Sequence, residues 1–234
     1  MVWRRLRLTV EGWQILLVYL LAGLLEAVWP VRSPRPEDAA LGIFRSIALT
    51  AGPTLMAVAW MKARARADAG SVKLGTLGSW VFLGFWCSAV GHASSAWPFV
   101  WTWPGSQHLA VARALAEDRA WAAMGGWVLV NCVMIPIVEE TIFRGWLLRL
   151  VRKKTDSEIA AVVCSSLLFG MAHLAWFGRS DLALVVNASW LALASVPVAH
   201  AVARTGRCEY AVAAHSGRNL AELVYLALFL ARSA

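Results

Sequence analysis

Long apolar segments, separated by short polar or basic stretches, recur along the whole chain. They cover about residues 13–29, 39–60, 74–97, 121–154, 157–177, 182–203 and 208–231. Most are close to the roughly 20 residues that an α-helix needs to cross a bilayer. The pattern predicts an all-α fold, a polytopic transmembrane helical bundle with about seven spans. The dipeptide Gly52-Pro53 predicts a break in the second segment.

One stretch leaves the number of spans open. Residues 109–119 form an amphipathic segment between the third and fourth apolar segments. Such a segment is typical of a helix that lies at the membrane surface, and we expect it on the outer side. If it also crosses or re-enters the membrane, the bundle has eight spans.

The composition agrees with a membrane protein. Hydrophobic residues make up 59% of the chain and charged residues 15%, whereas soluble domains carry about 45–50% and about 25%. These values exclude a disordered chain, a collagen-like repeat and an ordinary cytosolic enzyme. Because no linker is long enough to divide the chain, residues 1–234 are predicted to form a single integral membrane domain.

The positive charge follows the predicted topology. The chain has 22 Lys and Arg against 14 Asp and Glu, a formal charge of +8. An excess of this kind could indicate nucleic-acid binding. However, 14 basic residues flank the segments on one side and 4 on the other, as the positive-inside rule describes. We therefore expect a cytoplasmic N-terminus, a multi-pass protein of the cell inner (plasma) membrane, and no nucleic-acid partner.

Two adjacent carboxylates lie inside the fourth segment. Charged residues within a span cost about 2.5–3.5 kcal/mol each on insertion scales. Glu139 and Glu140 point about 100° apart on a helix, and Arg144 stands four residues after Glu140. This spacing favours a Glu140–Arg144 pair and leaves Glu139 as a candidate general base. In the alternative interpretation, both glutamates belong to a salt-bridge network that only holds helices together.

Two further segments supply imidazole and amide groups. His173 lies in the fifth segment, four residues after Phe169, and a lone histidine of this kind is more often a packing residue than a catalyst. His215 and Asn219 share one face of the seventh segment because they are four residues apart. Since each group is costly in lipid, we expect them to converge with Glu139 on one water-accessible cavity. There a carboxylate could accept a proton while histidine and asparagine donate hydrogen bonds to a developing oxyanion.

Three short motifs carry a family resemblance. The sequences EETIFR at 139–144, FGMAH at 169–173 and HSGRN at 215–219 resemble the ordered motifs E-E-x-x-x-R, F-x-x-x-H and H-x-x-x-N. These are the signature of the CPBP (CAAX protease and bacteriocin-processing) intramembrane proteases, the group of the Ras-converting CAAX endoprotease. The resemblance covers about residues 121–231 and implies that these residues form the catalytic core. The N-terminal spans in residues 1–120 carry no recognised motif.

The resemblance implies a role for each matched residue. It implies a glutamic-type protease in which Glu139 activates the hydrolytic water and His173 holds that water or assists proton transfer. His215 and Asn219 would form the oxyanion pocket, and a final group would support the site: Glu140, Arg144 and Phe169. The implied partner is a membrane-tethered protein or peptide substrate: a prenylated CAAX-like tail, a peptide leader or a C-terminal sorting tail. The chain is also similar to bacterial members proposed as myxosortases, which process such sorting tails.

Other interpretations stay open at this point. Zinc could be held by Glu and His residues, and the family was long discussed as intramembrane metalloproteases. We expect no metal or other cofactor, because no H-E-x-x-H occurs and the histidines lie on separate predicted helices. A non-proteolytic membrane partner or chaperone-like protein is one alternative function. A proton-coupled transporter is another, although the inverted repeats and broken helices typical of transporters are not found.

Overall fold

The computed structural model describes residues 14–21, 36–65, 74–93, 121–177 and 182–233. Every regular element in these ranges is helical, and they contain no strand, which confirms the all-α prediction. A short helix covers 14–21, and the longer ones are α2 (Pro36–Ala65), α3 (Leu74–Ala93), α8 (Glu158–Phe177), α9 (Leu182–Thr205) and α10 (Glu209–Ser233). The amphipathic residues 109–119 lie outside the described part of the chain.

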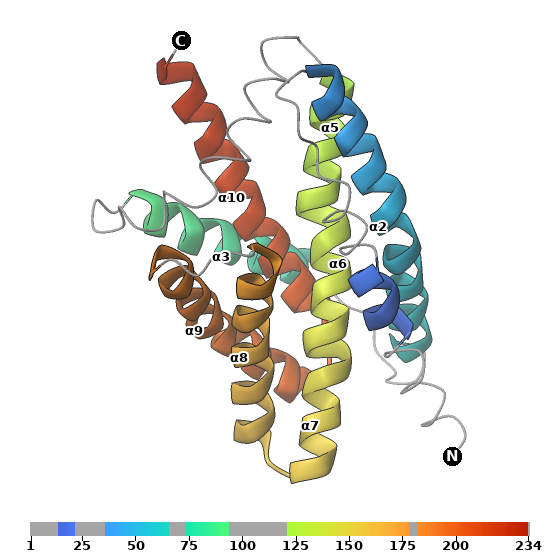
Figure 1. Cartoon of the computed structure of the whole chain (residues 1–234). Coiled ribbons are helices and arrows are strands. Elements are labelled where there is room, and N and C mark those ends of the chain that lie inside the picture. Colours follow the sequence, from blue (N-terminus) through green and yellow to red (C-terminus); the bar gives the residue numbers. More distant parts are fainter. Residues whose placement is uncertain (1–13, 22–35, 66–73, 94–120, 178–181, 234) are drawn as a thin grey trace.

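The fourth apolar segment forms a long composite helix (Figure 1). It consists of α5 (Trp121–Leu129), a π-helical turn η1 (Val130–Met134), α6 (Ile135–Glu140), a second π-helical turn η2 (Thr141–Leu147) and α7 (Leu148–Thr155). Its 35 residues span about 52 Å at 1.5 Å per residue, more than the roughly 30 Å of a hydrocarbon core. Of the helices in the described residues, this one is long and apolar enough to cross a membrane; the apolar helices Ile47–Met61 and Glu158–His173 are shorter.

The predicted break at Gly52-Pro53 is wrong. Helix α2 continues through Pro53. A proline inside a helix removes one main-chain hydrogen bond, but packing against a neighbouring helix can offset that loss. Pro53 and Ala57 are buried, and α2 packs against α6. The α2 helix therefore reaches the level of the two carboxylates without interruption.

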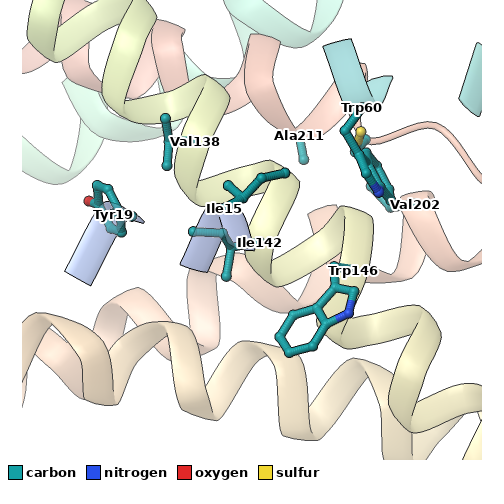
Figure 2. Close-up of a cluster of buried hydrophobic side chains, with 9 residues drawn as sticks. Ile15, Tyr19, Trp60, Val138, Ile142, Trp146, Val202 and Ala211 are labelled. Carbon is teal, nitrogen blue, oxygen red and sulfur yellow. The ribbon is translucent and has the colours of Figure 1, made fainter. Parts of the chain in front are cut away.

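A hydrophobic cluster joins the N-terminal part of the chain to the long helix (Figure 2). Its buried members come from the 14–21 helix, α2, the long helix, α9, the turn before α10 and the start of α10, and they are Ile15, Tyr19, Trp60, Val138, Ile142, Trp146, Val202, Cys208 and Ala211. Val138 and Ile142 flank Glu139 and Glu140 in sequence. Residues that carry no recognised motif thus help to fix the segment that carries the carboxylates.

Two glycines bring α3 and α10 into backbone contact. A Cβ added at Gly84 would collide with the carbonyl of Ala214, and one added at Gly217 would collide with the carbonyl of Val81. Small residues allow such close helix approaches within membranes. Helix α3 crosses α10 in Figure 1, so α3 fixes the position of the helix that carries His215 and Asn219.

We predict that Gly217→Ala destabilises the protein by about 1–3 kcal/mol, because the new methyl group overpacks a backbone contact. The measurement is the melting temperature of the purified variant in detergent. Gly125→Ala in α5 is the matched control, since its added methyl group meets nothing within 4 Å. Equal melting temperatures for the two variants would contradict the close packing of α3 on α10.

Candidate active site

Helix α6 holds both carboxylates at the centre of the described helices. Glu139 is 6% exposed and Glu140 is 2% exposed. Helix α6 packs against α2 and α10, and the adjoining η2 turn packs against α8. The two π-helical turns lie directly before and after α6, and such turns are frequent at functional sites. Two buried negative charges in this position require partners from the surrounding helices.

Glu140 is held by two basic side chains. Arg144 Nη1 lies 3.3 Å from Glu140 Oε1 and 3.2 Å from Oε2, which confirms the pair predicted from the i,i+4 spacing. His215 Nδ1 lies 2.9 Å from Glu140 Oε1. From the sequence we expected His215 to lie beside Glu139, but the hydrogen bond of His215 is to Glu140. The physical reason is the angle of about 100° between adjacent helical residues, which turns Glu140 rather than Glu139 toward His215 on α10.

Glu139 has different partners at its two oxygens. Tyr19 Oη donates a hydrogen bond to Oε1 across 2.7 Å. Oε2 has no hydrogen-bond partner among the described residues, and His173 Nε2 lies 4.0 Å away from it. One carboxylate oxygen is therefore anchored, while the other faces the imidazole of α8.

The backbone of α8 fixes the tautomer of His173. His173 Nδ1 lies 2.8 Å from the carbonyl oxygen of Phe169. A carbonyl can only accept, so Nδ1 carries the proton of the neutral ring. Nε2 then presents a lone pair toward Glu139.

The Phe169 ring joins the two histidines and the arginine. Its centroid lies 4.7 Å from that of His173 and 5.7 Å from that of His215. The guanidinium of Arg144 lies over the ring, 4.0 Å from its centroid, in cation–π geometry. Phe169 therefore packs between the Glu140 network and His173.

Asn219 contacts the long helix rather than a side chain. Its Nδ2 donates a hydrogen bond to the carbonyl oxygen of Asn131 in η1, across 2.7 Å. The structure thus brings Glu139 close to His173. It brings Glu140 together with Arg144 and His215. Asn219 contacts an earlier turn of the same long helix. The catalytic roles of these residues stay predictions.

The sequence did not reveal two contributors to this region. Tyr19 contacts Glu139 from 120 residues away, and the only signal for it was a hydroxyl in an apolar segment, which needs a partner when buried. Asn131 contributes its backbone carbonyl, which every residue has and which no sequence motif identifies.

The arrangement does not match a catalytic zinc site. Such sites use three protein ligands, and the described residues include no group of three or more His, Cys, Asp or Glu side chains that could hold a metal ion. Glu139 and His173 approach each other, but the Nδ1 atom of His215 is engaged by Glu140. Only two of the three ligands that a catalytic zinc ion needs therefore lie close together among the described residues, the Glu139 carboxylate and Nε2 of His173.

Comparison with known proteins gives one family. Residues 120–221 match the family model described as type II CAAX prenyl endopeptidase Rce1-like. This range contains Glu139, His173, His215 and Asn219 but not Tyr19. Neither the curated proteins nor the solved structures contain a match to the chain.

Proposed function

Because residues 120–221 match the model of the type II CAAX prenyl endopeptidase Rce1-like family, we propose that the chain is a glutamic-type intramembrane endopeptidase of that family. It hydrolyses a peptide bond near the membrane in a membrane-anchored or tail-bearing protein or peptide. The observation that supports this most directly is the free Oε2 atom of Glu139, buried and 4.0 Å from His173 Nε2 among the described residues.

This spacing suits one bridging water molecule. A water about 2.8 Å from each atom spans a gap of 4.0 Å. Both Oε2 of Glu139 and Nε2 of His173 are acceptors, so the water donates both of its hydrogens to them. Its lone pairs then stay free to attack a substrate carbonyl carbon. As the water attacks, Glu139 takes its proton and acts as general base. When the tetrahedral intermediate collapses, the C–N bond breaks and Glu139 returns this proton to the leaving nitrogen, which departs as the amine.

His215 and Asn219 supply the proposed oxyanion pocket. Because a carboxylate only accepts, the Nδ1 atom of His215 that faces Glu140 carries a hydrogen. The opposite nitrogen, Nε2, can donate to an oxyanion only if the ring is the imidazolium cation. Glu140 holds the His215 ring in place through this contact, and Arg144 holds Glu140 in turn.

The reaction in this scheme uses no metal ion. The carboxylate of Glu139 performs the proton transfer, and the hydrogen-bond donors of α10 stabilise the oxyanion. We therefore expect chelators to leave turnover unchanged.

The proposed setting is the inner (plasma) membrane, with several spans and a cytoplasmic N-terminus. The long apolar helix Trp121–Thr155 and the 14-to-4 distribution of basic residues support it. At the end of that helix, Arg149 and Arg152 donate hydrogen bonds to the carbonyls of Gly206 and Ala203. The basic end of the helix is thereby tied to the end of α9, and we place it on the cytoplasmic side.

The test is hydrolysis by the purified protein in lipid nanodiscs. Three probes are used: a quenched fluorescent peptide with a prenylated CAAX tail, the same peptide without the prenyl group, and a peptide that ends in an apolar helix followed by basic residues. We expect at least one tethered probe to be cut at a single bond, with ¹⁸O from labelled water in the new carboxylate and no effect of a chelator. Binding without hydrolysis of any probe would instead favour a non-proteolytic membrane partner.

The Tyr19 contact gives a sharper prediction. Tyr19→Phe should lower kcat by about 10-fold or more with little change in KM, because a hydrogen bond to a charged group contributes about 1.5–3 kcal/mol. Loss of the hydroxyl frees Oε1 and with it the orientation of the Glu139 carboxylate. The measurement is steady-state hydrolysis of the cleaved probe.

Tyr210→Phe is the matched control for this substitution. Tyr210 stacks on Trp80 with ring centroids 5.9 Å apart, so the same change there removes a hydroxyl without touching Glu139. Normal kcat in Tyr19→Phe would show that the Tyr19 hydrogen bond has no part in the reaction.

A further inference from the structure

The η1 turn, just before the carboxylates, breaks the regular hydrogen-bond pattern of the long helix. The N–H of Ile135 bonds to the carbonyl of Val130, five residues earlier, rather than to Asn131 as in an α-helix. The next residue, Pro136, has no N–H. The carbonyl of Asn131 therefore receives neither the α-helical bond from residue 135 nor the π-helical bond from residue 136.

Proline chemistry explains why the turn has this form. In a regular α-helix the ring of Pro136 would clash with the carbonyl of residue 132. The extra residue in the π-helical turn relieves that clash, and Pro136 is buried as the second residue of α6, next to that turn. One consequence is a backbone acceptor without its helical partner in a segment predicted to cross the membrane, where unsatisfied polar groups are costly.

The acceptor is satisfied by a residue of the proposed oxyanion pocket. Asn219 Nδ2 lies 2.7 Å from the Asn131 carbonyl oxygen, although the two residues are 88 positions apart. The side chain of Asn131 does not compete for this role, because its own Nδ2 donates to the carbonyl of Trp127 across 2.8 Å.

This contact fixes which way the Asn219 carboxamide is turned. A carbonyl oxygen can only accept, so the nitrogen of the amide must face Asn131 and Oδ1 must face away. One N–H is thereby used, and the second is held at a set angle to it. An oxyanion donor is effective only if it is oriented before the reaction.

We propose that Pro136 and the backbone carbonyl of Asn131 are positioning groups for Asn219. Pro136 keeps the carbonyl free of helical hydrogen bonds, and the carbonyl orients the carboxamide for oxyanion stabilisation. The catalytic consequence rests on the proposed protease function, whereas the orientation itself does not.

The experiment uses Pro136→Ala in the full-length protein. Alanine restores an N–H and removes the ring, so the helix can become regular and its N–H groups can engage the Asn131 carbonyl. Because the chain has three asparagines, at positions 131, 187 and 219, ¹⁵N-asparagine labelling gives three carboxamide signals, and Asn219→Asp identifies the one from Asn219. We expect the Asn219 signal to shift in Pro136→Ala and kcat on the cleaved probe to fall about 10- to 100-fold with KM within about two-fold.

Pro197→Ala is the matched control, because it also removes a proline from inside a helix, in α9. It should change neither the Asn219 signal nor the values of kcat and KM. An unshifted Asn219 signal in folded Pro136→Ala, or a shifted signal with normal kcat, would overturn the proposal.

A measurement on the unsubstituted protein covers the case in which Pro136→Ala does not fold. In solid-state NMR of protein labelled with ¹³C,¹⁵N-asparagine, the Asn131 carbonyl carbon and Asn219 Nδ2 should give a cross-peak, since a 2.7 Å hydrogen bond places them within about 4 Å. Absence of this cross-peak would overturn the positioning role. Failure to hydrolyse any probe, with the cross-peak present, would overturn the protease function and leave the orientation intact.

Discussion

Replacing Glu139 with glutamine is expected to lower kcat by about 10²- to 10⁴-fold, the usual contribution of a general base, while the protein still inserts and folds. Glutamine has nearly the same shape and keeps an oxygen that can accept the hydrogen bond now donated by Tyr19. A carboxamide cannot take a proton from water, so the step assigned to Oε2 is lost. The measurements are turnover of the cleaved probe and the melting temperature of the same preparation.

Glu222→Gln is the matched control for this loss. Glu222 is a carboxylate of α10 whose partner is Arg218, 3.9 Å away, and it is not part of the three motifs. Near-normal turnover in Glu139→Gln would refute the assignment of the base. An equal loss in both variants would show that the rate depends on intramembrane charge in general rather than on Glu139.

The helices were predictable because their signal is local. Apolar runs such as 157–177 and 182–203 correspond closely to α8 (Glu158–Phe177) and α9 (Leu182–Thr205), since length and hydrophobicity alone indicate a buried or lipid-facing helix. The Glu140–Arg144 pair was predictable for the same reason, because it depends on a spacing of four residues within one helix.

The two π-helical turns could not be predicted in this way. An apolar run has no feature that separates an α-helical from a π-helical turn. In η1 the cause is a single proline together with an amide donor from α10, which supplies the missing hydrogen bond. The wrong prediction of a break at Pro53 has the same physical cause. Whether a proline breaks, bends or only locally alters a helix depends on how that proline is packed, which the sequence does not show.

Pairings between distant helices were also beyond the sequence. The spacing of His215 and Asn219 indicated a shared face, but not that His215 would contact Glu140, 75 residues earlier. Likewise, no motif in residues 1–120 pointed to Tyr19 or to the packing of α3 on α10. These contacts depend on how whole helices pack, and spacing within one helix contains no information about its neighbours.

The buried pair leads to the second large expected effect. Glu140→Ala and Arg144→Ala should each lower the free energy of unfolding by about 3–5 kcal/mol, because removing one partner leaves the other charge buried and unpaired. Activity should fall with stability in both variants, since Glu140 also holds His215 and Arg144 also covers Phe169. The measurement is thermal unfolding of each variant in the same detergent, with Glu139→Gln as the variant for comparison.

Two comparisons separate a stranded charge from a general loss of packing. Glu158→Ala removes an accessible carboxylate that pairs with Arg152 and His200, whose side chains are 47% and 61% exposed. Accessible pairs of this kind contribute about 0–1 kcal/mol each, so this variant should melt near the native temperature. The double variant Glu140→Leu/Arg144→Met leaves neither member of the pair charged, and it should be more stable than Glu140→Ala or Arg144→Ala. If Glu139→Gln, Glu140→Ala and Arg144→Ala all melt at the same temperature, the buried pair is not what stabilises this part of the bundle.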